Sequence, residues 1–128
     1  MYGFSTNVSG SMGEVVEKVT EALKAEGFGV LTEIDVQATL KKKLNIDRKP
    51  YRILGACNPA LAHQALEAEP DIGLLLPCNV VVREEDDGSI NVAFMDPAAV
   101  LGIVNRYDIT KLGMEVRAKL ERVRDALA

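Results

Sequence analysis

Two cysteines, each followed directly by an asparagine, are the residues of this sequence best suited to chemistry. Cys57-Asn58 and Cys78-Asn79 each lie at the edge of a predicted strand, so an antiparallel sheet would bring the two pairs together. A helix that starts after Asn58 would favour the Cys57 thiolate through the partial positive charge of its N-terminus, which suits metal binding or redox exchange. The alternative is structural: two buried thiols, with Asn58 as a helix cap and Asn79 as the start of a strand. The spacing of the cysteines matches neither a zinc motif nor a thioredoxin motif.

A metal site would also need His63, the only histidine of the chain. It lies in the helix predicted after Asn58, with Glu67 one turn further along. The candidate metal ligands are therefore Cys57, Cys78 and His63. The alternative is that His63 and Glu67 only stabilise an exposed helix, since a lone histidine lacks the ligand count of a closed site.

Glu33 and Asp35 form a further candidate pair. They lie two positions apart in a predicted strand and so project from one face, where two carboxylates suit acid–base chemistry or a cation. The structural alternative places Glu33 on the solvated side and makes Asp35 the N-cap of the next helix. The full set of candidate ligand-binding residues is Cys57, Asn58, Cys78, Asn79 and Glu33.

No catalytic set stands out beyond these residues. One histidine does not assemble a Ser-His-Asp triad, and Gly27-Phe28-Gly29 ends a predicted helix, whereas a phosphate-binding loop opens one. We therefore predict no catalytic residues and assign no cofactor.

A cluster of basic side chains lies between Lys41 and Arg52. It comprises Lys41, Lys42, Lys43, Arg48, Lys49 and Arg52, with one acid, Asp47. With Tyr51 beside it, this cluster would suit an anionic ligand, but such a run is more often a solvated surface and one tyrosine is a small stacking platform. A third interpretation pairs the cluster with the acidic turn 84–87 of a second subunit.

The elements that would position these residues begin with a strand over residues 1–8. Ser11 and Glu14 form a capping box for a helix that ends at Gly27, and an alternating apolar pattern over 28–34 predicts a second strand. Asp35 is then placed to cap a short helix that carries Val36, Leu40 and Leu44, and a polar loop follows it.

A third strand is predicted over 51–57, and the helix from Pro59 must end by Pro70. The turn residues 86–89 separate two β-branched segments, as in a hairpin. Thr110 precedes a long C-terminal helix.

This order predicts an α+β fold with about five strands in one mainly antiparallel sheet and helices packed on one face. The 128 residues form a single domain, 1–128, large enough to need no disulfide for its core. A net charge of −4 makes nucleic acid an unlikely partner. The longest apolar run, 72–76, is far shorter than the ~20 residues that cross a bilayer, and no signal peptide is visible. We therefore expect no membrane contact and a cytoplasmic location.

Four stretches resemble the domain of unknown function 302 family: 27–35 (GFGVLTEID), 56–59 (ACNP), 73–82 (GLLLPCNVVV) and Asp96-Pro97. The resemblance is close through residues 27–97. It implies a β-α-β(4)-α arrangement of the TATA-binding-protein-like fold, often as a dimer. It implies no activity, because that family has no established catalytic residues, and a shared fold does not imply DNA binding.

These observations favour a non-catalytic module, a homodimer that binds a small molecule or a metal ion. The alternative is a thiol-dependent redox or metal-handling protein that uses Cys57 and Cys78. The two hypotheses assign different roles to the thiols, so the position of Cys57 relative to Cys78 is the observation that matters most.

Overall fold

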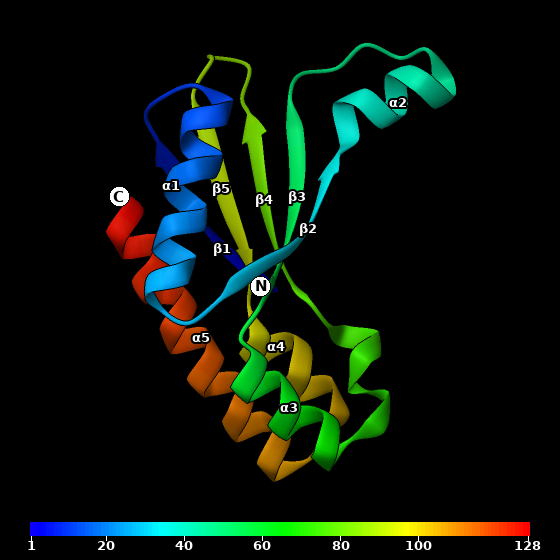
Figure 1. Ribbon diagram of the computed structural model, residues 1–128, viewed down its shortest axis with the longest axis vertical. Coiled ribbons are helices and arrows are strands. Elements are labelled where there is room, and N and C mark those ends of the chain that lie inside the picture. Colours follow the sequence, from blue (N-terminus) through cyan, green and yellow to red (C-terminus); the bar gives the residue numbers. More distant parts are fainter.

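A computed structural model describes residues 1–128, and its single sheet contains five strands (Figure 1). The strands are β1 (Gly3–Val8), β2 (Gly29–Asp35), β3 (Tyr51–Cys57), β4 (Cys78–Glu84) and β5 (Ile90–Met95). Their order is β1-β5-β4-β3-β2, and every neighbouring pair is antiparallel. The predicted α+β fold with one antiparallel sheet is confirmed.

Helices fill the connections between the strands. They are α1 (Met12–Ala25), α2 (Val36–Leu44), α3 (Pro59–Ala68), α4 (Pro97–Leu101) and α5 (Tyr107–Leu127), with short 3₁₀ helices η1 (Pro70–Leu75) and η2 (Gly102–Val104). The element order is therefore β-α-β(4)-α with α2, α3 and α4 inserted. None of these helices is both long and apolar enough to cross a membrane.

Short polar side chains start the helices where the sequence predicts. Ser11 Oγ accepts a hydrogen bond from the Glu14 N–H at 3.3 Å, and Glu14 accepts one from the Ser11 N–H at 3.1 Å, which completes the capping box. These bonds hold the pKa of Glu14 below its usual value, chiefly through the Ser11 backbone N–H. Asp35 caps α2 and Asn58 caps α3 in the same manner, each by accepting a backbone N–H.

The start of the C-terminal helix differs from the expectation. The prediction set it after Thr110, but α5 begins at Tyr107. Asp108 in the first turn accepts the Ile109 N–H at 2.9 Å and pairs with Arg106 at 3.0 Å. A carboxylate in the first turn interacts favourably with the partial positive charge at the helix N-terminus. The helix therefore begins without a side-chain cap at its N-cap residue, Arg106.

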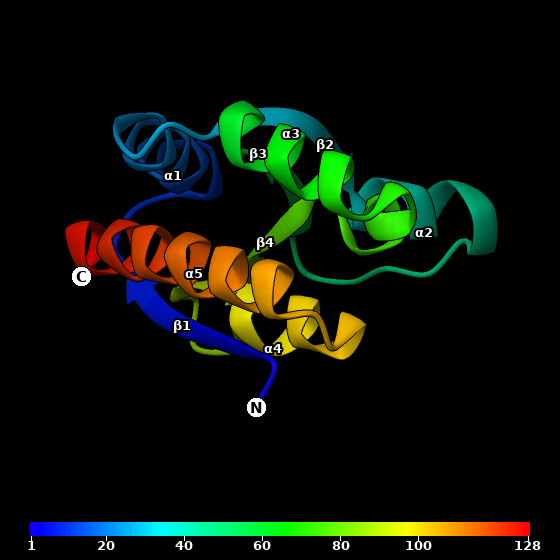
Figure 2. The ribbon, with the colours of Figure 1, turned by 90° about the horizontal axis from the view of Figure 1, so that it is seen from below.

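The core lies between the sheet and the helices α1 and α5. Figure 2 shows these two helices on one side of the sheet. Each contributes a fully buried apolar stripe, Val15, Val19 and Leu23 from α1 and Ile109, Leu120 and Val123 from α5. The stripes pack against Leu54, Val80, Val82, Val92 and Phe94 of the central strands. Burial of this aliphatic layer is the main stabilising contribution to the fold.

Helix α2 lies apart from this core. None of its residues is buried, and in Figure 1 it projects from the end of β2, clear of the other helices. Its last residue, Leu44, is 62% exposed. The predicted short helix is thus present; it contacts β3, with Val36 and Leu40 half-buried and Leu44 exposed.

Candidate functional site

The two cysteines lie at one end of neighbouring strands. Cys57 is the last residue of β3 and Cys78 the first of β4, and Ala56 pairs directly with Cys78 in the sheet. Asn58 follows Cys57 at the start of α3. The structure therefore brings Cys57, Asn58 and Cys78 together at the place where the sheet gives way to the helices.

These three residues line a pocket of about 320 Å³. Thirteen of its 16 lining residues are hydrophobic, and the others are Thr32, Asn58 and Pro77. The walls come from β2, the ends of β3 and β4, α3 and α5, and Figure 1 shows α3 and the first half of α5 below the sheet. Leu31 and Leu66, which are 66% and 44% exposed, form part of the lining and so mark the side on which the pocket opens to solvent.

Asn58 holds the pocket wall in place with both ends of its side-chain amide. Its Oδ1 accepts the Leu61 N–H at 3.4 Å, and its Nδ2 donates to the Glu26 carbonyl at 3.4 Å. The second bond joins the start of α3 to the end of α1. The same Nδ2 would lie 3.1 Å from a Cβ at Gly27, whose φ of +86° also favours glycine. The predicted cap is confirmed, and it also connects two elements that are distant in sequence.

The Cys78 thiol is buried and protonated. Desolvation raises its pKa to about 11, with a smaller contribution from the nearby Cys57. A group with this pKa is almost entirely in the thiol form at neutral pH, so it behaves as part of the apolar lining. Cys57 is half-buried. The environment of Cys78 therefore opposes the hypothesis that it supplies a thiolate.

The other predicted residues lie outside the pocket. Asn79 is exposed and pairs with Gly55, and Glu33 forms an ion pair with Arg52 at 3.6 Å. His63 is exposed on α3. No three His, Cys, Asp or Glu side chains come together as a group that could hold a metal ion, so Cys57, Cys78 and His63 form no such site.

Asp35 takes its structural role. Its carboxylate accepts the Ala38 N–H at 2.9 Å as the cap of α2. The predicted cap by Asp35 is thus confirmed, and Glu33 forms its ion pair with Arg52.

Sequence reasoning missed most of the pocket, because its lining is apolar and comes from distant segments. The missed residues are Phe28, Leu31, Thr32, Ala56, Leu61, Ala62, Ala65, Leu66, Leu76, Pro77, Leu101, Leu112 and Val116. One local feature pointed to it. Ala62 and Ala65 are small residues on the inner side of α3, where larger side chains would fill the space.

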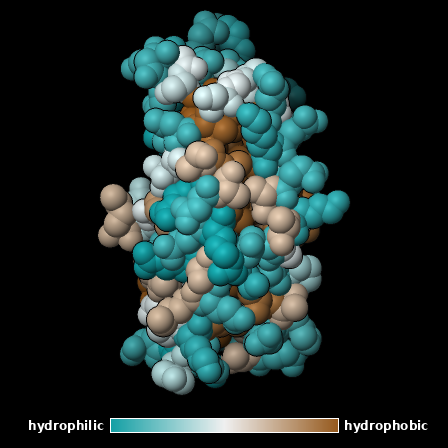
Figure 3. Space-filling view, turned by 90° about the vertical axis from the view of Figure 1, so that its left-hand side faces the viewer, coloured by the Kyte–Doolittle hydropathy of each residue, from teal (hydrophilic) through white to brown (hydrophobic).

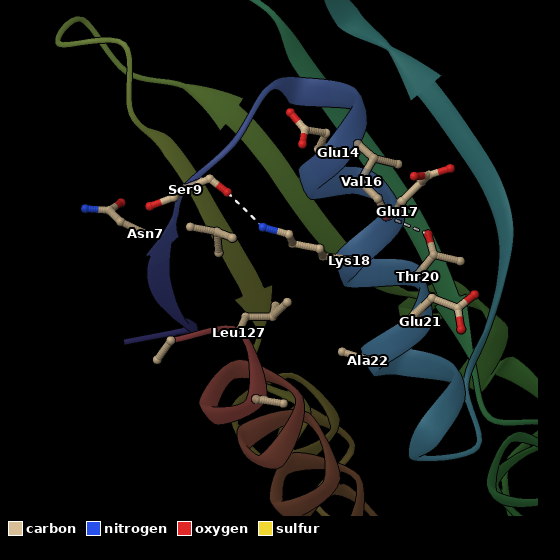
Figure 4. Close-up of a pocket in the computed structure, with 13 residues that line it drawn as sticks. Asn7, Ser9, Glu14, Val16, Glu17, Lys18, Thr20, Glu21, Ala22 and Leu127 are labelled. Atoms are coloured by element: carbon tan, nitrogen blue, oxygen red, sulfur yellow. Dashed lines mark hydrogen bonds between the residues drawn. The ribbon is translucent and has the colours of Figure 1, made fainter.

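A second, wider groove of about 1150 Å³ lies between β1, α1 and the end of α5. Figure 3 shows a narrow apolar strip framed by hydrophilic side chains on this side of the molecule, and Figure 4 shows the residues that line the groove. Lys18 Nζ donates to the Ser9 carbonyl at 3.1 Å across it, and Glu14, Glu17 and Glu21 stand along α1. These charged side chains are exposed to water, so a small ligand would bury less of its surface in the groove than in the pocket.

The fold and the pocket define the class: a small α+β protein with a one-sided antiparallel sheet and an apolar cavity at the end of its central strands. Residues 4–127 match the family described as domain of unknown function DUF302, and the chain belongs to this family. A solved structure, described as an uncharacterized conserved protein DUF302 from Bacillus stearothermophilus, is 31% identical with a TM-score of 0.92. The similarity covers 100% of this chain and 99% of that one. No curated protein matches the chain.

Proposed function

We propose that this protein is a non-catalytic binding module for a small, uncharged, largely apolar molecule. The observation that carries the proposal is the apolar pocket formed by β3, α3 and α5, with Cys57, Asn58 and Cys78 in its wall. Its volume of about 320 Å³ lies within the range typical of ligand pockets, which begins near ~300 Å³.

The lining defines the class of ligand. No charged residue lines the pocket, so a bound ion would lose its hydration without gaining a partner. Thr32 and Asn58 supply the side-chain oxygen and nitrogen atoms, which suits a single hydroxyl or carbonyl group. At roughly 30 Å³ for each water-sized unit, the volume corresponds to about ten non-hydrogen atoms.

The test compares two probes of equal chain length. We expect 1-octanol to shift the backbone amide signals of Leu61 and Ala65 in a two-dimensional NMR titration. Octanoate is expected to bind at least about tenfold more weakly, because its carboxylate has no cationic partner in the pocket.

A matched pair of variants locates the binding. Ala62→Phe fills the pocket and should abolish the octanol-induced shifts, whereas Ala60→Phe adds the same ring on the exposed side of α3, outside the pocket. Equal binding of octanol to both variants, or no binding to the wild-type protein, would contradict the proposal.

The second candidate function is thiol-dependent redox or metal handling. It is favoured by the position of Cys57 and Cys78 in one pocket wall, at the adjoining ends of the paired strands β3 and β4. Oxidation would form a disulfide by transferring two electrons and two protons to a peroxide. Thiol counting after treatment with hydrogen peroxide tests it: loss of both thiols in the wild type, with Cys57→Ser retaining the Cys78 thiol, supports this function. Two persistent thiols would exclude the redox function.

Two broader assignments accompany the proposal. The β-α-β(4)-α order supports a TATA-binding-protein-like fold, and the two free cysteines support a reducing compartment such as the cytoplasm. The charge of −4 is a reason not to extend the first assignment to DNA binding.

A further inference from the structure

The helix-free face of the sheet carries a continuous row of apolar side chains. The strand pairing aligns Ile34 with Ile53, Ile53 with Val81, and Val81 with Ala93. Directly paired residues project from the same face, and successive residues of a strand project from opposite faces. Since Leu54 and Val80 face the helices and are fully buried, Ile53 and Val81 must face the other way. The row therefore runs across four of the five strands without a helix above it.

Exposed apolar side chains also gather at the β2 edge of the sheet. Three of the 11 exposed large hydrophobic residues lie between positions 34 and 46: Ile34, Leu44 and Ile46. They belong to the edge strand β2, to α2 and to the loop after it. Exposed apolar residues that gather on one edge in this way mark an interaction surface.

The charges at the upper end of the sheet in Figure 1 are complementary. Helix α2 lies beside β2 on one side of that end, and the turn between β4 and β5 lies towards the other side. Lys42 and Lys43 are exposed at the end of α2 and have no acidic partner in the chain, whereas Lys41 is paired with Asp47 at 2.8 Å. The turn carries four consecutive acids, residues 84–87, of which one is paired with Arg83.

We propose that a second copy of this chain packs against the helix-free face, with the two sheets related by a two-fold axis parallel to the strands. Rotation about such an axis leaves the upper ends of the two sheets next to each other. It places the β2 edge of one sheet over the β1 edge of the other. It therefore sets Lys42 and Lys43 of each copy beside the acidic turn of the other, and it stacks the two apolar rows in opposite directions. This surface does not depend on the pocket or on its ligand.

The size of the surface is adequate for a stable dimer. Five strands about 4.8 Å apart and about 20 Å long give a flat projection of roughly 480 Å². A helix of nine residues adds roughly 140 Å². The accessible area of side chains exceeds their flat projection, so the surface approaches the ~800 Å² per partner of a standard interface.

The first test is the mass of the wild-type chain in solution, followed across a dilution series by sedimentation velocity. We expect a dimer that Ile34→Lys weakens by at least about 100-fold, because each copy would bury an unpaired charge. Ile103→Lys is the control, since Ile103 is 73% exposed in η2, away from the sheet. A monomeric wild type, or a dimer that tolerates Ile34→Lys as well as Ile103→Lys, would overturn the proposal.

The second test examines the charges and does not require a substitution in the sheet. Lys43→Glu and Asp86→Lys should each weaken the dimer about three- to tenfold, and the double variant should recover the wild-type affinity. Weakening without recovery would place the two residues apart and overturn the two-fold arrangement. In the wild type, a zero-length carbodiimide cross-link from Lys42 or Lys43 to the acidic turn should join a ¹⁵N-labelled copy to an unlabelled one. Cross-links found only within single copies would contradict the proposed dimer.

Discussion

The Cys78 thiol illustrates how burial decides what a residue is able to do. The sequence pattern gives Cys57 a helix N-terminus that favours its thiolate and makes Cys78 its candidate partner, but only the fold shows that Cys78 faces the core at 6% exposure. Removing a thiolate from water is costly, so the pKa rises to about 11. The same residue type thus serves as a wall of the pocket, and its chemistry at neutral pH is that of a small apolar group.

This shift makes the stability of the protein depend on pH. The folded-state pKa of Cys78 is about 11 against 9.0 without burial, so above about pH 9 the unfolded chain releases its proton more readily than the folded chain. The stabilisation that the buried, neutral Cys78 thiol gives to the folded chain is fully present below pH 9 and is lost as pH rises towards 11. At about pH 10 the loss of this stabilisation should lower the free energy of unfolding by about 1.4 kcal/mol.

Urea denaturation of the wild type and of Cys78→Ala checks this value, because tyrosines and lysines titrate in both proteins and cancel in the difference. The stability advantage of the wild type over Cys78→Ala should shrink by about 1.4 kcal/mol between about pH 8 and about pH 10. A constant difference would show that Cys78 titrates normally in the folded state.

At the scale of elements, the sequence predicts the helix caps and the antiparallel sheet, but it does not predict the pocket. The boundaries set by Ser11, Asp35 and Asn58 are confirmed, because a capping side chain bonds to a backbone group two or three residues away. The pocket could not be predicted in the same way, since its walls come from segments between Phe28 and Val116. The start of α5 was misplaced because Asp108 acts through its charge and through a bond to the next residue, without the spacing of a cap.

The contact between α4 and α5 depends on a glycine. A Cβ at Gly113 would lie 2.8 Å from the carbonyl oxygen of Pro97, and backbone atoms cannot move aside as a flexible side chain does. Gly113→Ala should therefore lower the free energy of unfolding by about 1–3 kcal/mol despite the better helix propensity of alanine.

Gly13→Ala is the matched control, because it makes the same substitution in α1 where nothing lies within 4 Å of the new Cβ. It should raise stability by about 0.5–1 kcal/mol. Thermal or urea unfolding of the two variants measures both effects. Equal changes in the two helices would mean that α4 does not approach α5 as closely as described.

At the scale of the whole molecule, stability is distributed unevenly. The central strands and the helices α1 and α5 share one core, whereas α2 adds no buried residue to it. The pattern of Val36, Leu40 and Leu44 correctly predicts a helix, but a pattern of this kind cannot say what will cover its apolar side. We therefore expect α2 to unfold more readily than the part of the chain that shares the core.

Hydrogen exchange measures this distribution directly. Amides of α2 should exchange at least about 100-fold faster than those of Val80 and Val82 in β4, because opening α2 exposes no core, whereas β4 opens only when the fold is lost. Mass spectrometry of peptic fragments, taken at the lowest usable protein concentration so that the single chain is observed, gives both rates. Equal protection in α2 and β4 would show that α2 unfolds together with the core. The fast exchange expected here follows from the lack of any fully buried residue in α2.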